Sequence, residues 1–127
     1  MREIEFRAWH KKENKMFYNV EHEYDYYEDC QSSFGNIIDM PERYELMQYT
    51  GKNDKHNNKI FEHDLIMFDG MKYIYEVVWD DESSSYKLQN RTIGFEWDYL
   101  ELRTFKTKAI EVVGNIYENY ELLGCLD

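Results

Sequence analysis

Apolar and polar residues alternate one by one wherever this chain shows a period, and this alternation constrains its fold more than any other feature. Ile4, Phe6 and Ala8 fall on one side of an extended segment, opposite charged neighbours. Successive side chains of a β-strand point to opposite faces, so such a segment makes a half-buried strand. Similar segments recur along the chain, and the sequence therefore predicts a mainly β fold.

The other expected strands are separated by polar turns. They cover residues 16–26, 44–50, 65–68, 73–79, 86–88, 93–99 and 105–116. The second half of the 16–26 segment is strongly acidic, so it is either an extension of that strand or an acidic loop. Only residues 118–123 have a helical pattern, closed by Gly124. Several short strands with few helical segments favour a small closed barrel or sandwich.

A hairpin is the strongest local prediction. Residues 65–68 form a continuous apolar run, and an alternating segment covers residues 73–79. Asp69 and Gly70 between them tolerate the positive φ of a tight type I′ turn. We expect the two segments to pair across this turn.

One boundary is expected inside the chain. At 127 residues the chain has the size of one domain, and its only proline, Pro41, is a natural place for an edge or a division. We therefore expect a β-rich N-terminal segment over residues 1–43 and a second part over residues 44–127, packed as one compact unit.

The charge of the chain limits its partners. Fifteen Lys and Arg stand against twenty-six Asp and Glu, which gives a formal net charge of −11. This is the wrong sign for holding phosphates, so we expect no direct binding to nucleic acid. No apolar run is long enough to cross a bilayer and no secretion signal precedes the first strand, so we expect a cytoplasmic protein without membrane contact. Cys30 and Cys125 are far apart in the sequence and belong to no C-x-x-C pair, so we expect reduced thiols and not a disulfide framework or a zinc site.

Three stretches resemble the YopX family of phage and prophage proteins. They are residues 2–9 (REIEFRAW), residues 46–51 (LMQYTG) running on to 60–66 (IFEHDLI), and residues 113–119 (VGNIYEN). The resemblance implies an N-terminal β-rich piece followed by a small SH3-type β-barrel, in a phage accessory protein of a bacterial host cell. The family usually has a glycine where His63 stands, which suggests that this turn does not strictly require positive φ.

The clustered polar residues do not predict an enzyme. Glu62, His63 and Asp64 are adjacent, but neighbouring side chains in an extended chain diverge, so we interpret them as solvated turn residues. Asn53 and Asp54 lie in a turn that lacks the ligand spacing of a calcium loop. We therefore expect no catalytic residues, no metal and no cofactor.

Aromatic residues are the remaining candidates for recognition. Trp79 and Trp97 could line a groove, although we expect most aromatic rings of a small β-domain to form its core. The segment from residue 23 differs, because it interleaves tyrosines with carboxylates. The candidate partner contact consists of Tyr24, Tyr26, Tyr27, Glu23 and Asp25. The alternative is a strand with one solvated face.

Two functional hypotheses follow. The first is a non-enzymatic interaction module that binds a host or phage protein, or another copy of itself, through a barrel face or the acidic segment. The second is an acidic decoy that mimics nucleic acid and occupies the basic groove of a host DNA-binding protein. A decoy needs a continuous acidic stripe, whereas an ordinary binder needs an aromatic or mixed patch.

Overall fold

The computed structural model describes residues 3–22 and 33–123, and the chain divides into two compact units, Met1–Tyr49 and Thr50–Asp127. Both are built mainly from antiparallel strands, so the predicted mainly β fold is confirmed. Strand β3 (Tyr44–Asn53) runs from the first unit into the second. The division expected between residues 43 and 44 stays a prediction.

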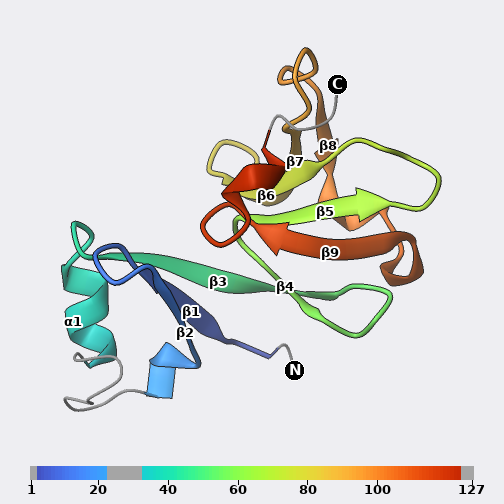
Figure 1. The fold of residues 1–127 in the computed structure, drawn as a ribbon. Helices are drawn as coiled ribbons and strands as arrows, with labels where there is room; N and C mark the ends of the chain where they lie inside the picture. Colours follow the sequence, from blue (N-terminus) through green and yellow to red (C-terminus); the bar gives the residue numbers. More distant parts are fainter. Residues whose placement is uncertain (1–2, 23–32, 124–127) are drawn as a thin grey trace. The chain divides into compact units, whose positions relative to one another are not determined.

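The first unit is a small sheet with one helix (Figure 1). Strand β1 (Phe6–His10) pairs with β2 (Lys15–Tyr18) on one side and with the first part of β3 on the other. Helix α1 spans Phe34–Asp39. Ala8, Phe17, Val20, Ile37 and Tyr44 form the buried core of this unit.

The structure of the first unit differs from the expected one in two places. The strand from Met16 does not run on through Val20, because Asn19 takes a φ of 58° and the chain turns into a short 3-10 helix, Val20–His22. Helix α1 was not expected from the pattern. It begins after Ser33, whose hydroxyl accepts a hydrogen bond from the Asn36 N–H at 3.3 Å, as an N-cap does.

The second unit contains a curled five-stranded antiparallel sheet. Its strands are β5 (Asp64–Phe68), β6 (Tyr75–Asp80), β7 (Ser85–Asn90), β8 (Tyr99–Glu101) and β9 (Ile110–Asn115), in the order β8-β7-β6-β5-β9. The last strand therefore returns to pair with the first, and β5 and β9 lie side by side in Figure 1. Strand β4 (Lys59–Phe61) lies beside the end of β3. The SH3-type barrel stays a prediction.

One buried cluster fills the inside of the curled sheet. Its buried members are Ile60, Ile66, Phe68, Tyr75, Val77, Leu88, Leu102 and Ile110. Three 3-10 helices complete the unit: Leu102–Thr104, Thr107–Ala109 and Tyr120–Leu122. The last of these lies within the segment that was expected to be helical.

The predicted hairpin exists, but its turn differs from the expected one. Leu65 pairs with Glu76 and Ile66 with Tyr75, so β5 and β6 are antiparallel neighbours. Met71 donates its N–H to the Phe68 carbonyl at 3.1 Å, which closes a turn around residues 69 and 70. Of these two residues only Gly70 has positive φ, at 78°. A type I′ turn requires positive φ at both, so the turn has the type II pattern.

The strand expected over residues 93–99 is a loop, and only Tyr99 belongs to a strand. Two local turns form it: Phe95 donates its N–H to the Thr92 carbonyl at 3.0 Å, and Asp98 donates to Phe95 at 2.9 Å. Gly94, inside the first of these turns, adopts a φ of 90°. The alternation of apolar and polar residues in this segment therefore does not correspond to a strand with one buried face.

A buried carboxylate, that of Asp54, organises the turn before β4. One of its oxygens accepts the N–H groups of His56 at 2.9 Å and Asn58 at 2.8 Å, and the other accepts the Val112 N–H at 2.9 Å. Burial would raise the pKa of Asp54, but these donors outweigh it and hold the pKa below the usual 3.8. Asp54 is therefore a turn residue, as expected. It also connects this turn to β9 through Val112.

The turn around residue 63 corrects two expectations. His63 has a φ of 69°, so the inference that this turn does not need positive φ is wrong. Asp64 is only 2% exposed and accepts the Phe61 N–H at 2.8 Å, so it is not a solvated residue. The His63 carbonyl also accepts the Ile116 N–H at 3.2 Å, which joins this turn to the end of β9.

A second turn follows β9, and residues 114–119 form its hydrogen bonds. The Asn115 side-chain oxygen accepts the N–H groups of Tyr117 at 2.9 Å and Glu118 at 2.8 Å. The side-chain oxygen of Asn119 accepts the Asn115 N–H at 3.0 Å. A Cβ on Gly114 would lie 2.4 Å from that oxygen, so only glycine fits there.

The conformation of Gly70 predicts the order of two variants. A Cβ at Gly70 meets nothing within 4 Å, so the cost of a substitution comes from its positive φ alone. Left-handed backbone costs a branched residue roughly 1–2 kcal/mol and costs asparagine less. Denaturant unfolding should therefore show Gly70→Val to be less stable than Gly70→Asn by about 1 kcal/mol. Equal midpoints would show that the turn is wrongly assigned.

The carboxylate of Asp54 predicts a pH-dependent loss of stability. Asp54→Asn should cost roughly 2 kcal/mol of unfolding free energy, because buried N–H groups lose a charged acceptor. The folded pKa is depressed, so the stability is present above the unfolded value of 3.8 and lost as pH falls through the folded pKa.

Chemical denaturation at several pH values measures this, and the variant should lose less stability than the parent on acidification. The exposed Asp81→Asn is the matched control and should change neither value. A parallel acid profile for parent and Asp54→Asn would contradict the assignment.

Candidate interaction surface

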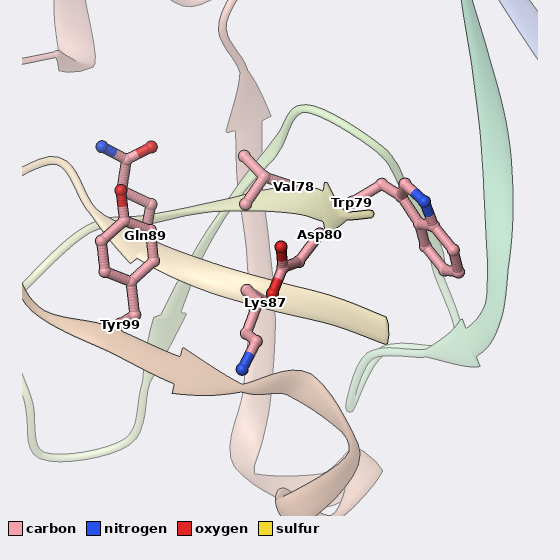
Figure 2. A pocket seen from close by; sticks show the side chains of 6 residues that line it. All are labelled: Val78, Trp79, Asp80, Lys87, Gln89 and Tyr99. Carbon is pink, nitrogen blue, oxygen red and sulfur yellow. The ribbon is translucent and has the colours of Figure 1, made fainter. Parts of the chain in front are cut away.

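The outer face of strands β6, β7 and β8 carries a hollow formed by side chains in cross-strand register. Val77 and Leu88 pair with each other and point into the core. The neighbouring pair, Val78 and Lys87, therefore points outward, and Gln89 pairs with Tyr99 on the same face. The "outer hollow" is the concavity of about 450 Å³ lined by Val78, Trp79, Asp80, Lys87, Gln89 and Tyr99 (Figure 2).

Two exposed aromatic residues line the outer hollow. Trp79 is 45% exposed at the end of β6, and Tyr99 is 54% exposed at the start of β8. Figure 2 shows Tyr99 beside Gln89 at one end of the hollow and Trp79 at the other, with the Trp79 ring turned away from Val78 and Lys87. The expectation that most rings belong to the core holds for Tyr44 and Tyr75 but is wrong for Trp79.

The charges of the outer hollow are already balanced by neighbours. Lys87 donates to a Glu101 carboxylate oxygen and lowers the pKa of Glu101 more than any other group does. Asp80 accepts the Ser83 hydroxyl at 2.7 Å, and that hydrogen bond is the main cause that lowers the pKa of Asp80. Both carboxylates are therefore ionised at neutral pH and paired, as in a contact surface of mixed polarity.

The loop over residues 91–98 adds exposed apolar surface next to Tyr99. Trp97 is 75% exposed and Ile93 is 60% exposed, so neither belongs to the core. The loop is nevertheless held at its base, because Asp98 accepts the Tyr75 hydroxyl at 3.0 Å and the Asn90 amide at 3.2 Å. Burial, followed by the hydrogen bond to Asp98, raises the pKa of Tyr75 to about 12.

A buried ion cluster lies at the opposite end of β6. The Glu76 side chain is 5% exposed and receives the Arg91 guanidinium at one oxygen and the His63 Nδ1 at the other, the latter at 2.7 Å. The His63 ring also contacts Tyr117 edge-on at 6.0 Å. His63 therefore meets Glu76 rather than its sequence neighbours, and sequence reasoning missed both Glu76 and Arg91.

The remaining histidines do not join this cluster. His10 is buried and its Nδ1 accepts the Glu13 N–H at 3.2 Å, while His22 lies 3.3 Å from Glu21. Within residues 3–22 and 33–123 no group of three or more His, Cys, Asp and Glu side chains could hold a metal ion. In the same residues no helix is long and apolar enough to cross a bilayer.

The predicted partner contact lies outside the described residues. It comprises Tyr24, Tyr26, Tyr27, Glu23 and Asp25, all within the segment 23–32. Its role as a contact surface stays a prediction. Among the described residues, the outer hollow and the loop beside it form a candidate contact surface. This surface includes Trp79 and Trp97, which the sequence analysis considered as groove residues.

Two comparisons match this chain to known proteins. A family model described as "YopX protein" matches residues 5–124. The crystal structure of protein EF1440 from Enterococcus faecalis is similar with a TM-score of 0.60 and 23% sequence identity, over 97% of this chain and 99% of that one. At this identity the likeness concerns the fold alone. No curated protein matches.

The anchor of the 91–98 loop predicts the effect of removing one hydroxyl. Tyr75→Phe should lower the unfolding free energy by about 1 kcal/mol, because Asp98 loses a buried donor. Chymotrypsin should also cut faster at Phe95 and Trp97 in folded protein. Tyr73→Phe is the matched control, since the Tyr73 ring packs on Phe95 with the ring centroids 4.9 Å apart and the variant keeps this ring. Equal cleavage of both variants would mean that this hydrogen bond does not hold the loop.

Proposed function

The chain belongs to the YopX protein family, and from this premise we propose that it is a non-enzymatic interaction module whose outer hollow binds a protein partner. The proposed setting is the cytoplasm of a bacterial host cell, where the chain acts as a phage or prophage accessory protein. The partner is a host or phage protein, or a second copy of this chain.

The observation that carries the proposal is the pair of exposed aromatic residues, Trp79 and Tyr99, that line a concave sheet face. Trp79 and Tyr99 each leave about half of their surface in solvent, at opposite ends of the outer hollow. Tryptophan and tyrosine are enriched where interfaces gain most of their binding energy. Trp97 and Ile93 extend the apolar surface beyond Tyr99.

A binding role fits the polar groups better than catalysis does. Three ionisable side chains, His63, Glu76 and Arg91, are joined in one ion cluster. A carboxylate held between two such donors is a poor general base, because both its oxygens are already occupied. The cluster instead supports the ends of β5 and β6.

The alternative of a nucleic-acid mimic has less support from the described residues. A mimic requires acidic side chains in an uninterrupted row. Here cations lie among the acids: Lys55 contacts Asp69 at 2.8 Å, and Lys87 and Arg91 each contact a glutamate. This mixture is what an ordinary protein-binding surface offers.

Replacing the two rings tests the proposal. The double variant Trp79→Ser/Tyr99→Ser should lose at least tenfold in affinity for the partner captured by the tagged parent, because two aromatic contacts disappear. Its thermal midpoint should change little, since both rings are half exposed. Affinity capture followed by titration with the identified partner measures this.

Tyr18→Ser, at a 49% exposed tyrosine of the first unit, is the control and should bind as the parent does. The triple variant Tyr24→Ser/Tyr26→Ser/Tyr27→Ser belongs in the same assay. If this variant alone loses the partner with its folding intact, the contact is the acidic segment and the outer hollow is not the site.

A further inference from the structure

A second hollow is lined by Tyr86, whose ring contacts that of Trp79. The "basic hollow" is a concavity of about 320 Å³ lined by Thr50, Gly51, Lys52, Ser85, Tyr86, Leu102 and Arg103. Leu102 is buried beneath it, while Lys52 and Tyr86 are half-buried and Arg103 is exposed. Its wall therefore combines apolar surface with two cations.

The charge of the basic hollow is opposite to that of the chain. The chain carries a net charge of −11, yet this concavity is lined by two cations and by no acidic residue. Within the described part of the chain no carboxylate pairs with Lys52, and Arg103 reaches Glu101 only at 3.7 Å with an 80% exposed side chain. Lys52 is therefore available to an acidic ligand, and the exposed Arg103 can exchange its long contact with Glu101 for one.

A contact between two aromatic residues, Trp79 and Tyr86, connects the two hollows. The ring of Trp79, which lines the outer hollow, contacts the Tyr86 ring of the basic hollow edge-on at 4.9 Å. Asp80 of the outer hollow pairs across the strands with Ser85 of the basic hollow. Glu101 also connects them, since its carboxylate contacts both Lys87 and Arg103. In the register of β6 and β7 the Trp79–Tyr86 pair points to the core side of the sheet, whereas Val78 and Lys87 point outward. An extended ligand segment that occupies both hollows must therefore pass over the end of the β6–β7 hairpin, at Asp80 and Ser85.

We propose that the basic hollow is a specificity subsite that binds the aspartate or glutamate side chain of an extended partner segment, whose apolar residue occupies the outer hollow. This rests on the proposed function, because it assigns the chemistry of the same partner. Lys52 and Arg103 contact the carboxylate and Tyr86 packs along its aliphatic stem. Charge-assisted contacts of this kind select among partners as well as adding affinity.

Selection from a displayed library of random short peptides provides the probe. The full chain should enrich peptides with an acidic residue at a fixed distance from an aromatic or aliphatic one. In the best peptide, replacing that Glu by Gln should weaken binding about tenfold, which corresponds to ~1.4 kcal/mol. With Lys52→Gln/Arg103→Gln the Glu and Gln peptides should bind equally.

Matched variants and peptides distinguish a failure of the proposed subsite from a failure of the outer hollow as the binding site. Lys106→Gln/Lys108→Gln changes the net charge equally at exposed positions outside the hollow and should keep the tenfold preference. Enrichment without an acidic residue, or a preference that survives Lys52→Gln/Arg103→Gln, overturns the subsite. So does a phosphoserine peptide that binds much more tightly than the Glu peptide, because the ligand is then a phosphorylated residue. Unchanged peptide binding by Trp79→Ser/Tyr99→Ser would instead overturn the outer hollow.

Discussion

The buried carboxylate of Asp54 is the interaction on which the second unit depends most. It lies before β4, at the start of the unit, and it accepts hydrogen bonds both from its own turn and from Val112 in the last strand. Residues 58 positions apart are thereby joined through one side chain. The turns at His63 and Asn115 add a second connection between β5 and β9. Closure of the curled sheet thus relies on polar groups as well as on its core.

These same contacts give the family resemblance a physical meaning. The stretches 60–66 and 113–119 contain His63 with positive φ, the buried Asp64, and Gly114 beneath Asn119. Each residue satisfies a backbone requirement and contributes nothing to the outer hollow. The residues by which the chain can be placed in its family are therefore those that make it fold, and the proposed binding residues lie elsewhere.

The alternation of apolar and polar residues predicted strands correctly where one face of the segment is buried. It predicted a strand wrongly where neither face is buried. The prediction that the 65–68 and 73–79 segments pair is correct in part: Leu65 pairs with Glu76 and Ile66 with Tyr75, because their apolar faces meet in the core, but residues 73 and 74 precede the strand. The 93–99 segment alternates equally well but exposes Ile93 and Trp97, so nothing specifies a strand. Helix α1 is too short to show a helical period, although its N-cap Ser33 was a readable signal. Glu76 occupies a polar position of a strand, and its partners His63 and Arg91 come from distant turns that spacing alone does not bring together.

The turn at Asp54 also has a consequence for self-association. Strand β9 is the last strand of its sheet, and its outward Val112 N–H and Ile110 carbonyl are occupied by the Asp54 carboxylate and by the Lys55 N–H at 2.9 Å. An open strand edge recruits further strands and promotes aggregation. The turn therefore blocks this edge of the sheet. If residues 54–58 detached while the core stayed folded, the Val112 N–H and the Ile110 carbonyl would become free to pair with a strand of another molecule.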